Sequence, residues 1–166
     1  MKNFRNTRWL TLGAAIAALY VVLTLVFAPI SFGPMQVRIA EALTILPLFT
    51  SAAVPGLFIG CVLANIIGGG VVLDVIFGSL ATLIGACLGY LLRHNRWLVP
   101  IPAIISNTII VPFVLRYGYG VADMAIPLMA LYIFIGELIG CYVLGELLGT
   151  ALLSRRTGIF EDGSGK

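Results

Sequence analysis

Long apolar runs separated by short polar breaks dominate the pattern of this chain. About 20 apolar residues are enough for a helix to cross the ~30 Å hydrocarbon core of a bilayer, so the runs predict membrane-spanning helices. The Pro55-Gly56 pair divides the apolar stretch from 38 to 71, which is too long for one helix. We therefore expect six spans, at 9–29, 38–54, 55–71, 73–92, 97–116 and 126–153.

Composition excludes a soluble domain. Of the 166 residues, 60% are hydrophobic and 10% are charged, whereas soluble domains carry about 25% charged residues. Eight of the ten basic residues fall on the side of the N-terminus, which places both termini in the cytoplasm. The expected fold class is an all-α integral membrane protein of the inner membrane, a six-helix bundle formed by residues 1–153 with a cytoplasmic tail at 154–166.

Catalytic and metal-binding motifs are absent from the sequence. There is no phosphate-binding loop for ATP, no HExxH and no GxSxG, and the net charge of +3 comes from loop arginines that form no nucleic-acid patch. Cys61, Cys87 and Cys141 lie in separate apolar runs, which favours packing roles over a disulfide or a metal site. We expect a binding protein, with no enzyme activity and no cofactor of its own, whose energy source lies elsewhere.

Polar side chains inside the spans indicate where function lies, because an ionised group at the membrane centre costs about 2.5–3.5 kcal/mol. Four spans each place one such group in the outer half of the bundle, and two further polar residues lie at span entrances. This convergence predicts a pocket open to the outside. Glu146 is deeper and two turns from Arg155, which favours a structural pair. The six outer residues are Glu41, Asn65, Asn107 and Glu137 inside spans, and Arg38 and Asp74 at entrances.

Structural roles compete with ligand binding at several of these positions. Arg38 and Glu41 are three residues apart on one helix face and can neutralise each other. Asn65 and Asn107 can hydrogen-bond to neighbouring helices as interhelical glue. Glu137 has no basic residue one turn away on its own helix, so a functional role is favoured there.

Several segments of the chain together carry a family likeness. The most specific is Arg-Ile-Ala-Glu-Ala-Leu at 38–43, within a longer segment at 32–49. The others are Pro55-Gly-Leu-Phe-Ile-Gly-Cys61, Ala64-Asn65, Asp74-Val-Ile-Phe-Gly-Ser-Leu-Ala-Thr-Leu83 and Gly136-Glu-Leu-Ile-Gly-Cys-Tyr-Val-Leu-Gly145. With these segments the chain resembles the QueT family, and the likeness runs from about residue 7 to 153.

The resemblance implies a substrate-binding S component of an energy-coupling factor (ECF) transporter. Such a subunit captures a queuosine precursor, a 7-deazaguanine, and docks on a membrane T component attached to two cytoplasmic ATPases. In S components an Ala-x-x-x-Ala face on the first helix contacts the T component. Here that face is Ala14 and Ala18, with Gly13 and Ala17 alongside.

A 7-deazaguanine offers two donors on one edge and a carbonyl acceptor nearby, which suggests a role for each polar residue. One carboxylate can accept both donors, and an amide or guanidinium can donate to the carbonyl. Asp74 is the candidate for a cationic aminomethyl group, and the loop 30–37 is the candidate lid. The other candidates are Glu137 or Glu41 for the donor edge, Asn65, Asn107 or Arg38 for the carbonyl, and Tyr132, Phe32 or Tyr117 for stacking.

Three other functions remain open at the level of sequence. The chain could be an S component for another flat heterocycle, such as riboflavin, thiamine or a purine. It could also be a stand-alone proton-coupled transporter that uses Glu137 and Glu146 as a relay, or a purely structural membrane protein.

Overall fold

The computed structural model describes residues 2–31 and 38–154, and the regular structure in these residues is helical throughout. Three segments depart from α geometry: η1 is a 3₁₀ helix, and η2 and η4 are π-helical. η2 continues directly into α4, and α6, η4 and α7 form one uninterrupted helix. The elements are α1 (Lys2–Val26), α2 (Ala28–Ser31), η1 (Ile39–Leu48), α3 (Ala53–Ile67), η2 (Asp74–Gly78), α4 (Ser79–Leu91), η3 (Arg96–Leu98), α5 (Ile101–Tyr117), α6 (Ile126–Glu137), η4 (Leu138–Leu144) and α7 (Gly145–Ser154).

Four helices are long and apolar enough to cross a membrane by length and composition, at Thr7–Val26, Asp74–Leu91, Arg96–Tyr117 and Ile126–Ser154. These agree with the first, fourth, fifth and sixth predicted spans. The predicted second and third spans are shorter helices, Ile39–Leu48 and Ala53–Ile67. Pro47 lies inside the first of them, and proline lacks the backbone donor that would extend a regular α-helix.

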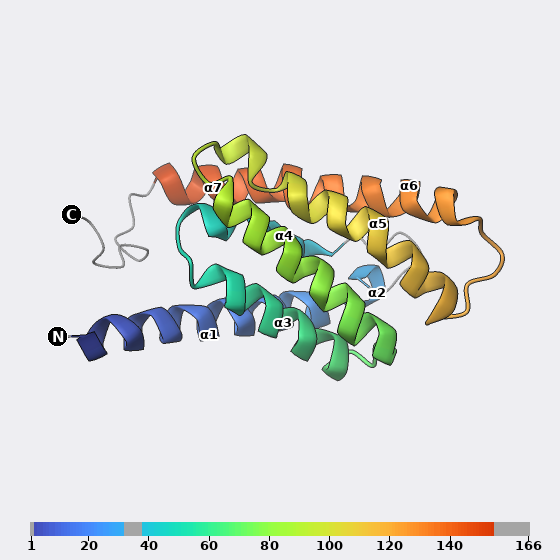
Figure 1. The fold of residues 1–166 in the computed structure, drawn as a ribbon, viewed down its shortest axis with the longest axis horizontal. Coiled ribbons are helices and arrows are strands. Elements are labelled where there is room, and N and C mark those ends of the chain that lie inside the picture. Colours follow the sequence, from blue (N-terminus) through green and yellow to red (C-terminus); the bar gives the residue numbers. More distant parts are fainter. Residues whose placement is uncertain (1, 32–37, 155–166) are drawn as a thin grey trace.

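The short helix η1 lies at the centre of the bundle. Residues 40–47 are all buried, and η1 contacts α1, α3, α4, η4 and α7. α1 packs along α3, α4 along α5, and α5 along α6, so that the longer helices surround η1 (Figure 1). α1 begins and α7 ends at the same end of the bundle, and the α5–α6 connection lies at the opposite end (Figure 1).

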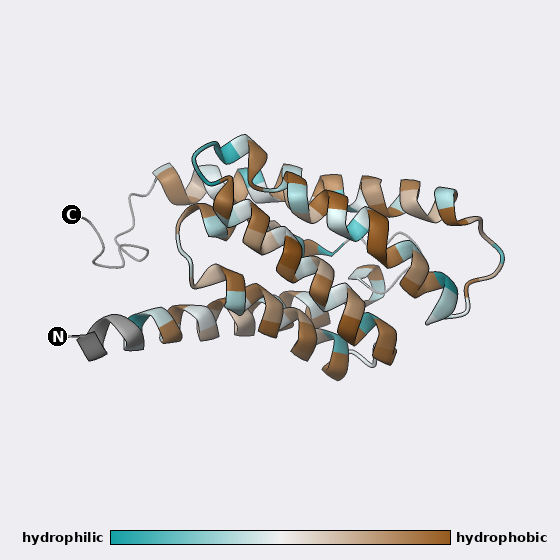
Figure 2. Cartoon of the chain, in the orientation of Figure 1, coloured by the Kyte–Doolittle hydropathy of each residue, from teal (hydrophilic) through white to brown (hydrophobic). Residues whose placement is uncertain are grey.

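Most of the helical ribbon is coloured hydrophobic, and hydrophilic residues are found mainly in connections and at a few positions along the helices (Figure 2). Many large apolar side chains point outward along the long helices, among them Val22, Ile84, Ile109 and Leu147. Water would penalise so much exposed apolar surface, whereas lipid does not. The surface is that of a membrane protein.

Candidate functional site

Four of the five buried charged residues in the described part of the chain lie within, or immediately before, the helical segments that depart from α geometry. Arg38 immediately precedes η1, Glu41 lies in its first turn, and Asp74 is the first residue of η2. Glu137 immediately precedes η4, which contains Cys141. Long 3₁₀ runs are uncommon, and π-helical turns occur frequently at functional sites, because both redirect side chains relative to an α-helix. The backbone irregularity and the buried charges therefore mark one region.

We call this region the polar centre. Its side chains come from all six predicted spans, with Asn107 as the contribution of α5. All of them are buried: Glu41 is 1% exposed, Glu137 is 4% exposed and Asp74 is fully buried. The polar centre consists of Tyr20, Arg38, Glu41, Cys61, Asn65, Asp74, Thr82, Asn107, Glu137 and Cys141.

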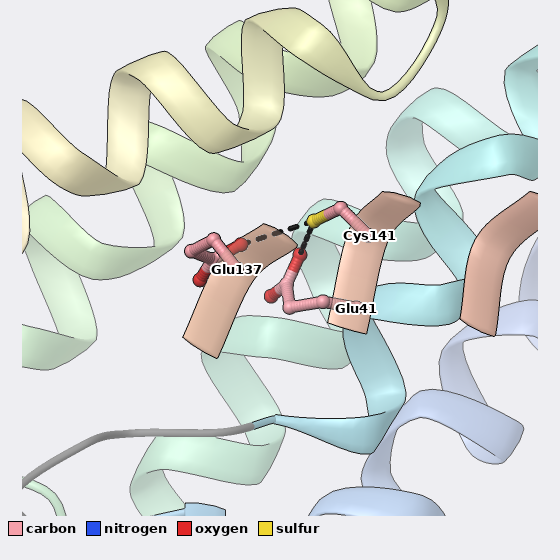
Figure 3. A group of neighbouring side chains, drawn as sticks. All are labelled: Glu41, Glu137 and Cys141. Carbon is pink, nitrogen blue, oxygen red and sulfur yellow. Dashed lines mark hydrogen bonds between the residues drawn. The ribbon is translucent and has the colours of Figure 1, made fainter. Parts of the chain in front are cut away.

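Two glutamates face each other across the thiol of Cys141 (Figure 3). The Cys141 Sγ donates to Glu137 Oε2 at 3.0 Å and lies 3.9 Å from Glu41 Oε2. Gly140 permits this close approach of η4 to η1, since a Cβ at this position would lie 2.9 Å from the Arg38 carbonyl oxygen. The two carboxyl groups are thus held together by the backbone.

Each of the two glutamates also hydrogen-bonds to a side chain of another helix. The Tyr20 hydroxyl of α1 donates to Glu41 Oε1, and the Asn107 side chain of α5 hydrogen-bonds to Glu137. Glu41, Glu137 and Cys141 place one ligand atom each within 4.8 Å of one another, a spacing within reach of a divalent metal ion. The sequence suggested only a packing role for Cys141, whereas the structure places it between two carboxyl groups.

Arg38 pairs with a further buried acidic residue of the polar centre. Its Nη2 forms a buried ion pair with Asp74 Oδ2 at 3.2 Å, and its Nη1 lies 3.8 Å from Cys61 Sγ. The predicted pairing of Arg38 with Glu41 is therefore replaced, as the nearest ion pair, by one with Asp74. Asn65 joins the same group, because its Nδ2 donates to the Asp74 backbone oxygen at 3.2 Å.

Tyr119 closes this group from the connection between α5 and α6. Its hydroxyl donates to Asp74 Oδ2 at 2.9 Å. Partial burial, followed by the charge of Asp74, raises the pKa of Tyr119 to about 12. The hydroxyl therefore keeps its proton at neutral pH and remains a donor to Asp74.

The predicted stacking aromatics are not among the residues of the polar centre, and one of them lies outside the described residues. Tyr117 is 71% exposed and lines an apolar groove of about 310 Å³ between η2 and α5. Tyr132 is half-buried on α6. Phe32 lies outside the described residues, as does most of the predicted lid at 30–37. The aromatic side chain that does reach the centre is Tyr20, which the sequence did not single out.

The small residues of the first helix divide into two sets. Gly13 and Ala17 are buried against α3, where Gly56 and Gly60 lie opposite them. Ala14 and Ala18 are exposed on the other side of α1. The first pair thus packs within the chain, and the second pair forms an exposed small-residue face.

Glu146 forms its ion pair with a residue other than the predicted one. Arg96 donates through Nε at 3.0 Å and through Nη2 at 2.7 Å to Glu146 Oε2. The same Nη2 also donates to Thr150 at 2.8 Å. Arg155, the expected partner, lies outside the described residues. The pair joins the α4–α5 connection to α7 and is separate from the polar centre.

Residues 10–154 match the family described as QueT transporter. The queuosine precursor transporter QueT of Lactococcus lactis subsp. cremoris (strain MG1363) is 41% identical over 81 residues, which are 48% of this chain and 47% of that relative. The matched part spans about half the length of this curated relative, and no solved structure matches the chain. Because the family match covers most of its length, the chain belongs to the QueT transporter family, a family of multi-span membrane transporters and not of enzymes.

Proposed function

We propose that this chain is the substrate-binding S component of an ECF importer and that it captures a 7-deazaguanine precursor of queuosine from outside the cell. The single observation that carries the proposal is the polar centre: buried carboxyl, amide and guanidinium groups from separate helices meet inside a bundle of the QueT family. Groups of this kind are expensive in a membrane interior and are retained there for function. The name of the Lactococcus relative supports the substrate class.

The chemistry of the centre fits the edge of a deazaguanine. Glu41 and Glu137 together offer carboxylate oxygens to the ring N–H and the exocyclic amine. Asn107, which already contacts Glu137, is placed to donate to the neighbouring carbonyl. An analogue that lacks these donors would leave buried carboxylates unpaired, and such mismatches discriminate more strongly than changes in apolar contact.

Six crossings and cytoplasmic termini belong to the same proposal. The shorter helices η1 and α3 are about 20 and 22 Å long at ~2.0 and ~1.5 Å per residue, which is less than the ~30 Å hydrocarbon core, so residues beyond their ends contribute to these two crossings. An even number of crossings is supported by the common end at which α1 begins and α7 ends (Figure 1). Asp74 and Tyr119 then lie near the outer side, and the Arg96–Glu146 pair lies near the inner side.

Partner subunits supply the energy in this proposal. The sequence has no ATP-binding loop, so a T component and two ATPases would drive import. The exposed pair Ala14 and Ala18 is the proposed contact with the T component, because small residues allow helix backbones to approach closely in lipid.

The direct test is ligand binding by the purified chain without its partners. We expect mass spectrometry of the protein, isolated from cells that contain queuosine precursors, to find a bound 7-deazaguanine. Calorimetry should then show that this compound binds more tightly than riboflavin, thiamine or guanine. Binding of riboflavin or thiamine in preference to every deazaguanine would overturn the substrate assignment while leaving the S-component role in place.

A further inference from the structure

Two oxygen atoms at the edge of the polar centre have no hydrogen-bond partner. They are Asn65 Oδ1 and Asp74 Oδ1, and both residues are fully buried. A buried acceptor without a donor costs about 1–3 kcal/mol, and more when it is charged. Such atoms point to a donor that the bare chain does not provide.

The remaining capacity of both side chains is for accepting hydrogen bonds. Asp74 Oδ2 already accepts hydrogen bonds from Arg38 and Tyr119. Asn65 Nδ2 donates to the Asp74 backbone oxygen. Both side chains converge on Gly78: a Cβ there would collide with Asp74 Oδ1 and lie 3.6 Å from Asn65 Nδ2. Gly78 thus leaves room for the Asp74 carboxylate itself, and the group that completes the two open oxygens must be a donor.

The chemistry of Asp74 indicates which kind of donor fits. Arg38 pairs with Asp74 Oδ2 only, so the second carboxylate oxygen, Oδ1, stays open to another donor. Hydrogen bonds from a charged donor to a carboxylate are shorter and stronger than those from a neutral donor. A cationic donor therefore fits Asp74 Oδ1 better than a neutral one.

We propose that Asn65 and Asp74 form a subsite for a primary ammonium group carried by the cargo. This inference rests on the proposed function and specifies its substrate: a 7-deazaguanine whose substituent is a protonated aminomethyl group. An ammonium has three N–H donors and no acceptor. It can donate to both Asn65 Oδ1 and Asp74 Oδ1, while Glu41 and Glu137 accept from the donor edge of the ring.

Three ligands with the same ring test the subsite on the unaltered protein. The 7-aminomethyl, 7-hydroxymethyl and 7-cyano forms of 7-deazaguanine differ in charge and in donor number at one position. We expect the aminomethyl form to bind at least ~10-fold more tightly than the hydroxymethyl form, with the cyano form weakest, because a nitrile donates no hydrogen bond. Equal affinities, or tighter binding of the cyano form, would overturn the inference.

A matched pair of variants locates the effect. Asp74→Asn removes the charge of a buried residue with little change in shape. Asp123→Asn makes the same change at an exposed residue of the α5–α6 connection. The aminomethyl-to-cyano affinity ratio should fall at least ~10-fold in Asp74→Asn and keep its wild-type value in Asp123→Asn. An unchanged ratio in a folded Asp74→Asn protein would contradict the subsite.

The outcomes separate this inference from the function on which it rests. If all three deazaguanines bind equally well, the subsite is wrong and the proposed function stands. If none of the three binds, the proposed function fails and the subsite fails with it. If Asp74→Asn does not fold, because Arg38 loses its ion-pair partner, the ligand series on the wild-type protein decides the question.

Discussion

The contact between α1 and α3 and the polar centre are built in opposite ways. Along α1 and α3 the helices are regular, and small residues allow the backbones to touch: a Cβ on Gly60 would lie 2.8 Å from Tyr20 Cβ. In the polar centre the helices depart from α geometry and the contacts are hydrogen bonds between buried charged groups. Lipid provides no hydrophobic force between helices, so close packing and polar contacts are the two available means.

Tyr20 belongs to both regions. Its Cβ lies against Gly60 in the α1–α3 contact, and its hydroxyl donates to Glu41 in the polar centre. The packed region thus positions a donor for the polar one. The difference teaches that the first region holds the bundle together, whereas the second accepts polar groups that would otherwise be too costly to bury.

The largest expected effect comes from Glu137→Gln, which breaks the polar side of the comparison. The change replaces a carboxylate acceptor by an amide that presents N–H groups to the donors of the cargo. Charged hydrogen bonds contribute about 1.5–3 kcal/mol each, so the Kd for the deazaguanine should rise by about 100-fold and uptake should be abolished. Calorimetry and uptake assays measure the two effects.

Glu146→Gln is the matched control for that variant. It changes the same residue type on the same continuous helix, but Glu146 pairs with Arg96 outside the polar centre. Membrane insertion and assembly with the partner subunits should be retained in both variants. Wild-type-like cargo binding by Glu137→Gln would remove Glu137 from the site.

A smaller effect is expected from Gly60→Ala, which tests the packed side of the comparison. The new methyl group would meet Tyr20 Cβ at 2.8 Å and the Ala17 carbonyl oxygen at 3.0 Å. Overpacking of this kind costs about 1–3 kcal/mol, so the Tm in detergent should fall. Gly145→Ala is the control, since its methyl would find its nearest atom at 3.4 Å. Equal Tm values for the two variants would show that the α1–α3 contact adapts easily.

The smallest effect is expected from Arg96→Gln, which removes an ion pair outside both regions. The Arg96 side chain is 29% exposed, and ion pairs near the surface contribute up to about 1 kcal/mol. The Tm should fall slightly, and cargo affinity should stay at the wild-type value. Arg93→Gln serves as control in the same connection, because Arg93 contacts Tyr90 near the end of the preceding helix, α4. A large loss of cargo affinity in Arg96→Gln alone would extend the site to this end of the bundle.

Hydrophobic length predicted the helical membrane fold and located four long helices correctly, because apolar runs of that size have few other structures available. It overestimated the second span. The helix η1 is shorter than the predicted span and packs against distant segments, as at Gly140 and Arg38, and contacts between distant segments leave no local periodicity in the sequence.

Buried charge predicted most of the polar centre. Glu41, Asp74 and Glu137 stood out because acidic residues are rare in and beside spans, and the structure buries all three, with Glu41 and Glu137 around Cys141 and Asp74 on Arg38. Tyr20 and Cys141 were not identified, because an aromatic ring and a thiol are ordinary inside a membrane helix. Their signal is spatial: each becomes notable only beside a carboxyl group.

A structure of the chain with a bound 7-deazaguanine tests the central claim most directly. We predict that the ring lies in the polar centre, with its donor edge within hydrogen-bond distance of Glu41 or Glu137. Cargo bound instead in the apolar groove between η2 and α5, with the contacts among Glu41, Glu137 and Cys141 unchanged, would contradict the account.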